Sequence, residues 1–173
     1  NPEIILDKIV DDFLKKDSDL KYTLEILYNY QSKLLPILIK INNLFNDLMD
    51  YPVFQKIWLD IKNCNHDNPS GTKMIYHLES KLDRHLVFAC LQTGICCLES
   101  NIEDTEFIFL SMVTALFHDI GKPISENVNL TFNHKSYKGH GWMGQVLWTK
   151  IMLEFKNSSD FYKYFTNESN ILI

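Results

Sequence analysis

The chain is short of positive charge, of long apolar runs and of cysteine. Its 17 lysines and arginines against 22 acidic residues give a formal net charge of −5, which excludes a basic module that wraps nucleic acid through a general positive field. No stretch approaches the roughly 20 uninterrupted apolar residues of a membrane span. No signal-peptide pattern opens the chain either. We therefore expect no membrane partner.

Only four cysteines are present: Cys64, Cys90, Cys96 and Cys97. Neighbouring Cys96 and Cys97 cannot readily form a disulfide with each other, and no pair has the CxxC spacing of a structural zinc site. Reduced thiols in a cytoplasmic protein are the simplest interpretation.

Aromatic residues, in contrast, are plentiful. Eleven Phe, eight Tyr and three Trp in 173 residues provide the apolar surface for one folded core, and they exclude a disordered chain. The chain begins with Asn1 rather than Met, so we expect a piece of a longer protein, whose other domains are candidate partners.

Helical periodicity dominates the first part of the sequence. It predicts a helix that ends near Lys16, a long apolar stripe over residues 20–48 that Pro36 kinks or breaks at Leu35, and a helix over residues 53–62. Residues 63–73 contain Asn, Pro, Ser and Gly in a row and are typical of a loop. We expect residues 1–62 to form an N-terminal helical segment that packs on a core of residues 63–173.

The same periodicity continues after the loop. It predicts a buried helix over residues 76–98, a turn at residues 101–104, and an apolar helix that Asp104 or Thr105 caps. That helix is expected to end where Gly121 permits a left-handed exit and Pro123 prevents continuation. Residues 124–139 are polar and irregular, and a last helix covers residues 142–155. Since no strand alternation persists, the predicted fold is an all-α bundle.

A histidine and an aspartate, His118 and Asp119, are adjacent at the end of the apolar helix. By itself such a pair is more often a helix cap and a solvated carboxylate than a metal site. His85 precedes His118 by 33 residues, which is enough for two antiparallel helices to bring both imidazoles to the same end. Mixed nitrogen and oxygen ligands of this kind suit Mn, Fe, Co, Ni or Zn.

Two further pieces accompany this pair. Arg84 is next to His85 and is either a clamp for phosphate oxygens or an exposed surface charge. His140 lies within Gly139–Gly144 at the expected start of the last helix, where glycines permit close packing against neighbours. His66, two residues after Cys64, matches no spacing that indicates a site.

Together these pieces resemble the HD-domain superfamily of metal-dependent phosphohydrolases. The pattern of that family is a helix-borne His, a His-Asp doublet often followed by Ile-Gly-Lys, and a Gly-His-x-x-x-Gly stretch. His85, His118–Pro123 and Gly139–Gly144 match it in order, over the region 76–155. The resemblance implies an HD-like helical core, with the residues before it as additional N-terminal helices.

The resemblance also implies the ligands of a divalent metal (Mn, Fe, Co, Ni, Zn or Mg), which are His85, His118 and Asp119. In two-metal members of the family, further histidines bind a second ion, so His134 and His140 are candidates and the site holds one or two ions. The family's fourth ligand is an Asp on a later helix. Here Asp160 is the only aspartate after Asp119, so that counterpart lies beyond residue 173 or does not exist.

The function that the resemblance implies is hydrolysis of a phosphomonoester or phosphodiester, with a phosphorylated small molecule, a nucleotide or a nucleic-acid end as substrate. Lys122 and Arg84 would hold phosphate oxygens, and His134 or Lys122 would be the general acid. One alternative is a non-catalytic HD module that binds a nucleotide or a partner protein within a larger chain. Another is a di-iron oxygenase, because some relatives of this fold have that chemistry.

Overall fold

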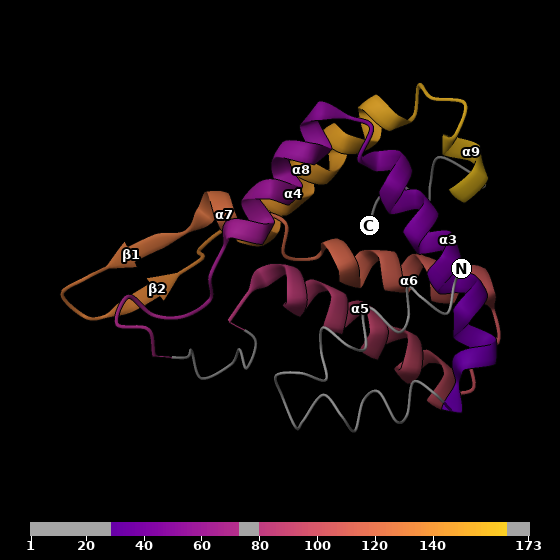
Figure 1. Cartoon of the computed structure of the whole chain (residues 1–173), viewed down its shortest axis with the longest axis horizontal. Coiled ribbons are helices and arrows are strands. Elements are labelled where there is room, and N and C mark those ends of the chain that lie inside the picture. Colours follow the sequence, from indigo (N-terminus) through magenta and orange to yellow (C-terminus); the bar gives the residue numbers. More distant parts are fainter. Residues whose placement is uncertain (1–28, 73–79, 166–173) are drawn as a thin grey trace.

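The computed structural model describes residues 29–72 and 80–165 of the chain. This part is mostly helical, with one small two-stranded sheet (Figure 1). Its elements are α3 (Gln31–Leu48), α4 (Pro52–Asn63), α5 (Leu82–Glu99), α6 (Thr105–Phe117), α7 (Lys122–Ser125), β1 (Asn127–Asn129), β2 (His134–Ser136), α8 (His140–Phe155) and α9 (Phe161–Tyr164).

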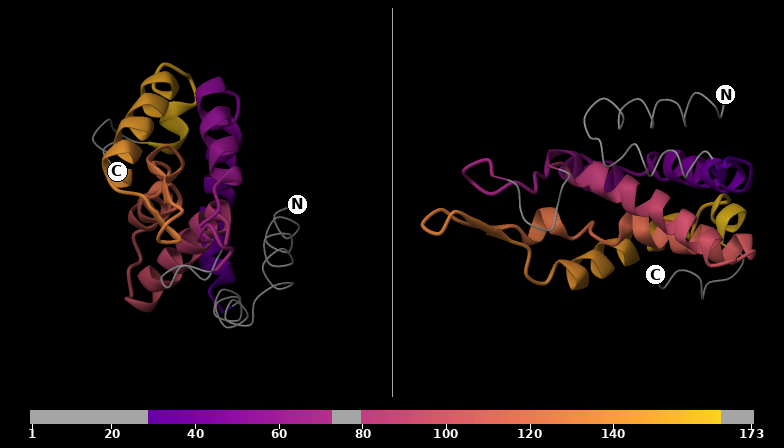
Figure 2. Two further views of the ribbon diagram at one scale, coloured as in Figure 1. Left: turned by 90° about the vertical axis from the view of Figure 1, so that its left-hand side faces the viewer. Right: turned by 90° about the horizontal axis from the view of Figure 1, so that it is seen from below.

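Helices α5 and α6 form the central antiparallel pair. Helix α3 packs on α6, α4 packs on both α5 and α7, and α7 packs on α8. The two further views in Figure 2 show that the β1–β2 hairpin projects from one end of this assembly. The ends of α5, α6 and α8 that carry the predicted site residues lie toward that hairpin (Figure 1).

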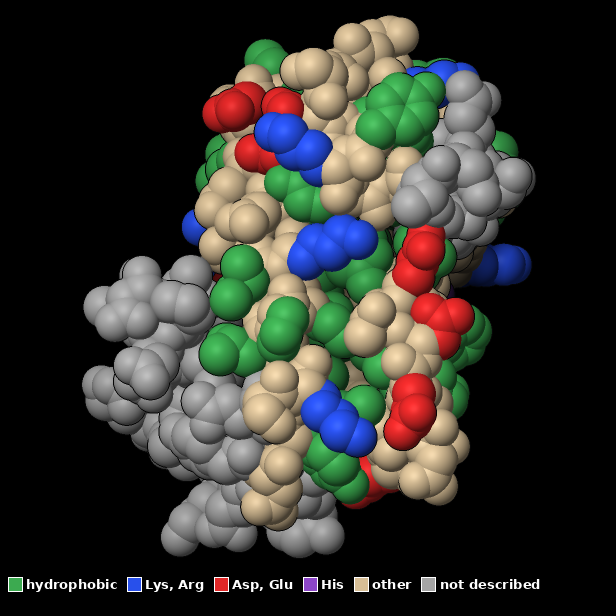
Figure 3. All heavy atoms as spheres, turned by 90° about the vertical axis from the view of Figure 1, so that its right-hand side faces the viewer, with side chains coloured by type: hydrophobic (Ala, Val, Ile, Leu, Met, Phe, Trp, Pro, Cys, Tyr) green, Lys and Arg blue, Asp and Glu red, His purple; other side chains and the backbone are tan. Residues whose placement is uncertain are grey.

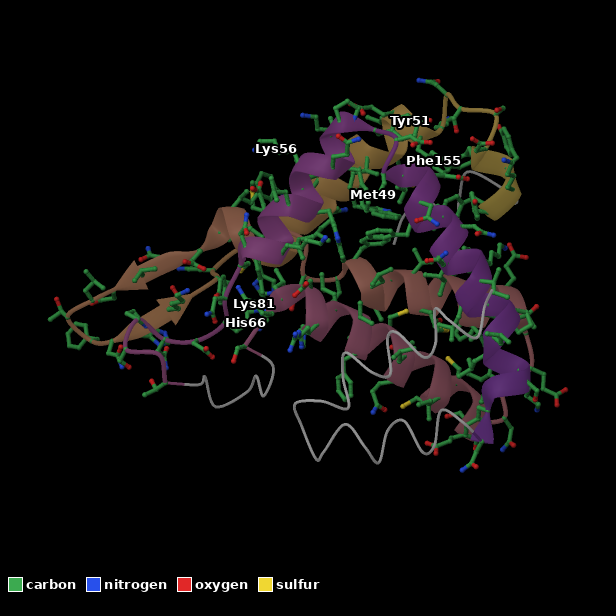
Figure 4. All side chains as sticks on the ribbon, viewed as in Figure 1. Met49, Tyr51, Lys56, His66, Lys81 and Phe155 are labelled. Atoms are coloured by element: carbon green, nitrogen blue, oxygen red, sulfur yellow. The ribbon has the colours of Figure 1, made fainter. Side chains whose placement is uncertain are left out.

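One aromatic core joins the helices before the loop at residues 63–73 to those after it. The ring of Phe117 on α6 lies 5.9 Å from Phe54 on α4 and 4.8 Å from Trp148 on α8. At the C-terminal end of α8, the rings of Tyr51 and Phe155 pack edge to face with their centroids 5.9 Å apart (Figure 4). Ring pairs at these separations add to the stability that burial itself provides. The described part of the N-terminal segment is therefore part of the same core.

Helix α3 continues through Pro36, so the alternative of a break at Leu35 is wrong. Proline removes one backbone hydrogen bond, but Leu34 and Ile37 on either side of it are buried in the core. Their burial holds the helix together across the proline. The predicted helix that ends near Lys16, and the stripe before residue 29, lie outside the described residues.

Helix α5 begins at Leu82, and neither Ser80 nor Lys81 is helical, so the predicted continuous helix over residues 76–98 is corrected. Residues 76–79 of that prediction lie outside the described residues. Lys81 has extended backbone and forms an antiparallel bridge with Asn65 instead. At Lys81, pairing with Asn65 of the preceding loop takes the place of helical hydrogen bonds. The predicted helix α6 is confirmed with its cap, because Asp104 Oδ1 accepts hydrogen bonds from the N–H groups of Glu106 and Phe107 at 3.0 and 3.1 Å.

The sequence prediction missed the β1–β2 hairpin. Its strands are only three residues long, and β1 is exposed throughout, so no alternation of buried and exposed positions marks it. The pairing runs antiparallel from Asn127 with Ser136 to Asn129 with His134. The hairpin brings residue 137 back toward the helices, where α8 begins.

The stretch Thr105–Ser125 meets the criteria of length and composition for a membrane span, with a hydropathy of 1.3. In this fold 56% of the 18-residue window that meets these criteria is buried. It also contains the charged side chains of Asp119 and Lys122, each 4% exposed. Within this stretch α6 packs against α5 and α3, and that burial is enough to explain why the stretch is apolar.

Candidate metal centre

Three helix ends bring four predicted ligands together. His85 lies in the first turn of α5, His118 is the C-cap of α6 with Asp119 directly after it, and His140 is the first residue of α8. The face of the molecule in Figure 3 shows apolar, basic and acidic side chains but no described histidine.

The carboxylate of Asp119 is the centre of this group. Its Oδ2 lies 3.5 Å from His85 Nε2 and 3.1 Å from His118 Nε2. Its Oδ1 lies 3.2 Å from His140 Nε2. One donor atom from each of His85, His118 and Asp119 falls within 4.8 Å of the other two. The juxtaposition expected from the spacing of the sequence is thus present, and His140 joins it on the second carboxylate oxygen.

Backbone carbonyl groups fix two of these imidazole rings. Nδ1 of His118 lies 2.7 Å from the Ala115 carbonyl oxygen, and Nδ1 of His140 lies 2.6 Å from that of Tyr137. A carbonyl can only accept, so each Nδ1 carries the hydrogen and donates it. In the neutral rings the lone pair is then on Nε2, the atom that faces Asp119. Such a tautomer is the one that metal-binding histidines adopt when a carbonyl orients them.

Those lone pairs and the carboxylate would repel each other at 3.1–3.2 Å. The arrangement therefore needs either a second proton on each ring or a shared cation. Ligand atoms that share one ion at bonds of about 2.0–2.2 Å lie about 3.0–3.5 Å apart, because the bonds meet at about 90–109°. The observed separations of 3.1–3.5 Å between the histidine nitrogens and Asp119 match this spacing, and the donor set suits a divalent transition metal.

Gly121 permits the close contact between the end of α6 and the start of α8. A Cβ atom on Gly121 would lie 2.1 Å from the His140 carbonyl oxygen and 2.5 Å from Gly144 N. The sequence predicted a left-handed exit at Gly121, but its φ is −79°. The residue is glycine because the backbone of α8 occupies the place of a side chain. Pro123 also differs from the prediction, since it lies in the first turn of α7 instead of ending a helix.

Asp119 is 4% exposed. Burial by itself would raise its pKa, but hydrogen bonds from His118, His85 and Lys122 outweigh burial and hold the pKa well below the usual range for aspartate. Lys122 Nζ approaches Asp119 Oδ2 to 2.7 Å. The lysine that was expected to hold a phosphate thus contacts the central carboxylate in this structure.

The other predicted residues have different places. Arg84 is partly buried on α5, next to His85. His134 is exposed at the start of β2, beside the loop at the tip of the hairpin (Figure 1), and the structure does not bring it to Asp119. Asp160 directly precedes α9, and its carboxylate pairs with Lys163. It lies beyond the opposite end of α8, so it does not supply the family's fourth ligand.

Sequence reasoning missed His66 and Tyr137. His66 is fully buried, and its ring lies 5.5 Å from that of His85. Tyr137 has its ring 5.9 Å from His66, and its hydroxyl contacts Glu126 Oε2 at 3.4 Å. A histidine in a polar loop gives no periodic signal of burial. The only signal for His66 in the sequence was that it is a histidine upstream of His85, and it shares this feature with His77.

Comparison with known proteins finds no matching family model, no matching curated protein and no matching solved structure.

Proposed function

We propose that this chain is a metal-dependent phosphohydrolase of the HD type, with an HD-like core built from α5, α6 and α8. The observation that carries the proposal is the convergence of three imidazole Nε2 atoms on the Asp119 carboxylate at 3.1–3.5 Å. His85, His118 and Asp119 would hold a divalent ion, with His140 on the other carboxylate oxygen. When bound, such an ion acidifies a water molecule and neutralises charge on a phosphoryl oxygen.

The side chains around the site have separate tasks in this proposal. The Lys122 ammonium group beside Asp119 favours the ionised carboxylate and fixes its orientation. The carbonyl groups of Ala115 and Tyr137 hold the Nε2 atoms of His118 and His140 toward Asp119. Preorganised donors of this kind need no rearrangement when a substrate arrives.

The exposure of the ligands indicates the direction of substrate entry. The side chains of His118 and His140 are 40% and 39% exposed, whereas those of His85 and Asp119 are 19% and 5% exposed. The site is thus open on the side of His118 and His140. A phosphoester would approach from there, and the guanidinium group of Arg84 beside His85 is the candidate to bind its phosphate oxygens.

Hydrolysis of bis(p-nitrophenyl) phosphate and of p-nitrophenyl phosphate, each with added Mn²⁺, tests the activity. We expect release of p-nitrophenol from at least one of them, and loss of that release in Asp119→Asn. Tyr162→Phe, an exposed change on α9, is the matched control and should retain the activity. A chain that binds Mn²⁺ but hydrolyses neither ester would contradict the proposal.

A second candidate function is a non-catalytic HD module that binds a nucleotide or a partner protein. The position of Asp160 favours it, because the aspartate that could have been the fourth ligand lies directly before α9 and pairs with Lys163 instead. Retention of a nucleotide without hydrolysis, measured by calorimetry and by chromatography of the recovered nucleotide, would distinguish this module from the enzyme.

A further inference from the structure

His66 is held firmly against the start of α5. Its backbone N–H donates to the Ser80 carbonyl at 2.9 Å, and the carbonyl of Cys64 accepts from Leu82 N–H at 3.2 Å. Between them Asn65 and Lys81 form the antiparallel bridge. Figure 4 shows His66 beside Lys81, where this pairing meets the base of the hairpin. His66 therefore has a defined position relative to the first turn of α5, the turn that carries His85.

The hairpin holds the same loop from another direction. Lys135 Nζ and Tyr137 Oη both donate to the carbonyl oxygen of Asn65, at 2.9 and 3.2 Å. The ring of Tyr137 packs on His66 at 5.9 Å with an angle of 67° between the planes. Tyr137 is itself buried, and its own carbonyl orients His140. His66 thus lies between Tyr137 and His85.

The ring of His85 has two imidazole neighbours. The ring of His66 lies 5.5 Å away at 70°, and that of His118 lies 5.4 Å away at 56°. The first contact is edge to face and the second is tilted, and rings packed at these distances restrict how the His85 ring can rotate. His118 contacts Asp119 directly, at 3.1 Å. His66 is a buried ring against His85 that the proposed chemistry does not use.

We propose that His66 is a positioning residue for His85. Its ring fills the space beside His85 and keeps Nε2 of His85 turned toward Asp119, so it sets the affinity of the site for a divalent cation. This inference rests on the metal site of the proposed function. Removal of a residue that orients a metal ligand without binding the metal itself typically weakens metal affinity about 10- to 100-fold.

The experiment measures the affinity of the whole chain for Mn²⁺ from the electron paramagnetic resonance signal of free Mn²⁺. The wild type is compared with three single variants at His66. His66→Ala removes the ring, His66→Leu keeps apolar bulk without a ring, and His66→Phe keeps a planar ring without nitrogen. Ile95→Ala on α5 is the matched control, since it opens a cavity at a residue that is 2% exposed and away from the site. Thermal unfolding of each variant shows whether it is folded.

We expect His66→Ala and His66→Leu to bind Mn²⁺ about 10- to 100-fold more weakly, with His66→Phe and Ile95→Ala close to the wild type. If His66→Ala does not fold, the comparison of the Leu and Phe variants decides. Wild-type affinity in His66→Leu, or a loss in His66→Phe as large as that in His66→Leu, would overturn the positioning role. Absence of Mn²⁺ binding by the wild-type chain would instead overturn the proposed function on which this role rests.

Discussion

A Cβ atom on Gly121 would lie 2.1 Å from the carbonyl oxygen of His140. Backbone therefore touches backbone where the end of α6 meets the start of α8. This contact places His140 next to Asp119, and it explains a glycine directly after Ile120 better than any turn conformation does.

Gly121→Ala is expected to destabilise the fold by about 1–3 kcal/mol, the usual cost of an added methyl group in a packed site. Here the cost should reach the upper part of that range because the opposing atoms are backbone. Urea denaturation measures the change. Gly141→Ala is the matched control, because nothing lies within 4 Å of its Cβ position. Within helix α8 it should be neutral or stabilising by about 0.5–1 kcal/mol. Equal effects of the two substitutions would contradict the close contact.

The two candidate ligands for a second ion are expected to differ. His140→Ala removes a nitrogen 3.2 Å from Asp119 Oδ1, and it should weaken Mn²⁺ binding. His134→Ala removes an exposed side chain at the hairpin, and it should leave Mn²⁺ affinity and stoichiometry unchanged. Titration followed by the signal of free Mn²⁺ measures both. Loss of an ion in His134→Ala would show that the hairpin folds onto the site.

The cysteines are expected to react at different rates. Burial raises the pKa of the Cys90 thiol to about 12, so almost none of it is thiolate at pH 8, and its side chain is also shielded. Cys96 is exposed. Mass spectrometry after a short treatment with iodoacetamide should show native protein modified at Cys96 and not at Cys90, and denatured protein modified at both. Rapid modification of Cys90 in the native protein would place α5 differently in the core.

Alkaline pH is expected to weaken the fold through Tyr164. Its hydroxyl donates to Asp47 Oδ2 at 2.6 Å, and burial together with this hydrogen bond raises its pKa above the usual value. The unfolded chain then loses the phenolic proton first, so this contribution is complete below pH ~10 and declines at higher pH.

Tyr164→Phe tests this by urea denaturation between pH 7 and 11. The variant should lose about 1–2 kcal/mol at pH 7, where the hydrogen bond to a carboxylate is missing. Its stability should then fall less steeply than that of the wild type above pH 10. Parallel curves for the two proteins would show that Tyr164 does not titrate as expected.

The helices and the His118–Asp119 pair could be predicted because local pattern determines them. Asp104 caps α6 through its own side chain, and the apolar spacing of α4 is visible in the sequence. The hairpin, the bridge of Asn65 with Lys81 and the burial of His66 depend on contacts between distant residues. The sequence singles out Gly121, but it does not show why glycine is needed there. Only the folded chain shows that the backbone of α8 occupies the position of a side chain at residue 121.

The most direct test of the metal site is elemental analysis of the purified chain after loading with Mn²⁺ and removal of free metal, alongside the double variant His118→Ala, Asp119→Ala. The wild-type chain should retain at least one equivalent of metal, and the double variant should retain none while it stays folded by circular dichroism. A wild-type chain that retains no metal, or a double variant that retains as much as the wild type, would contradict the site at Asp119.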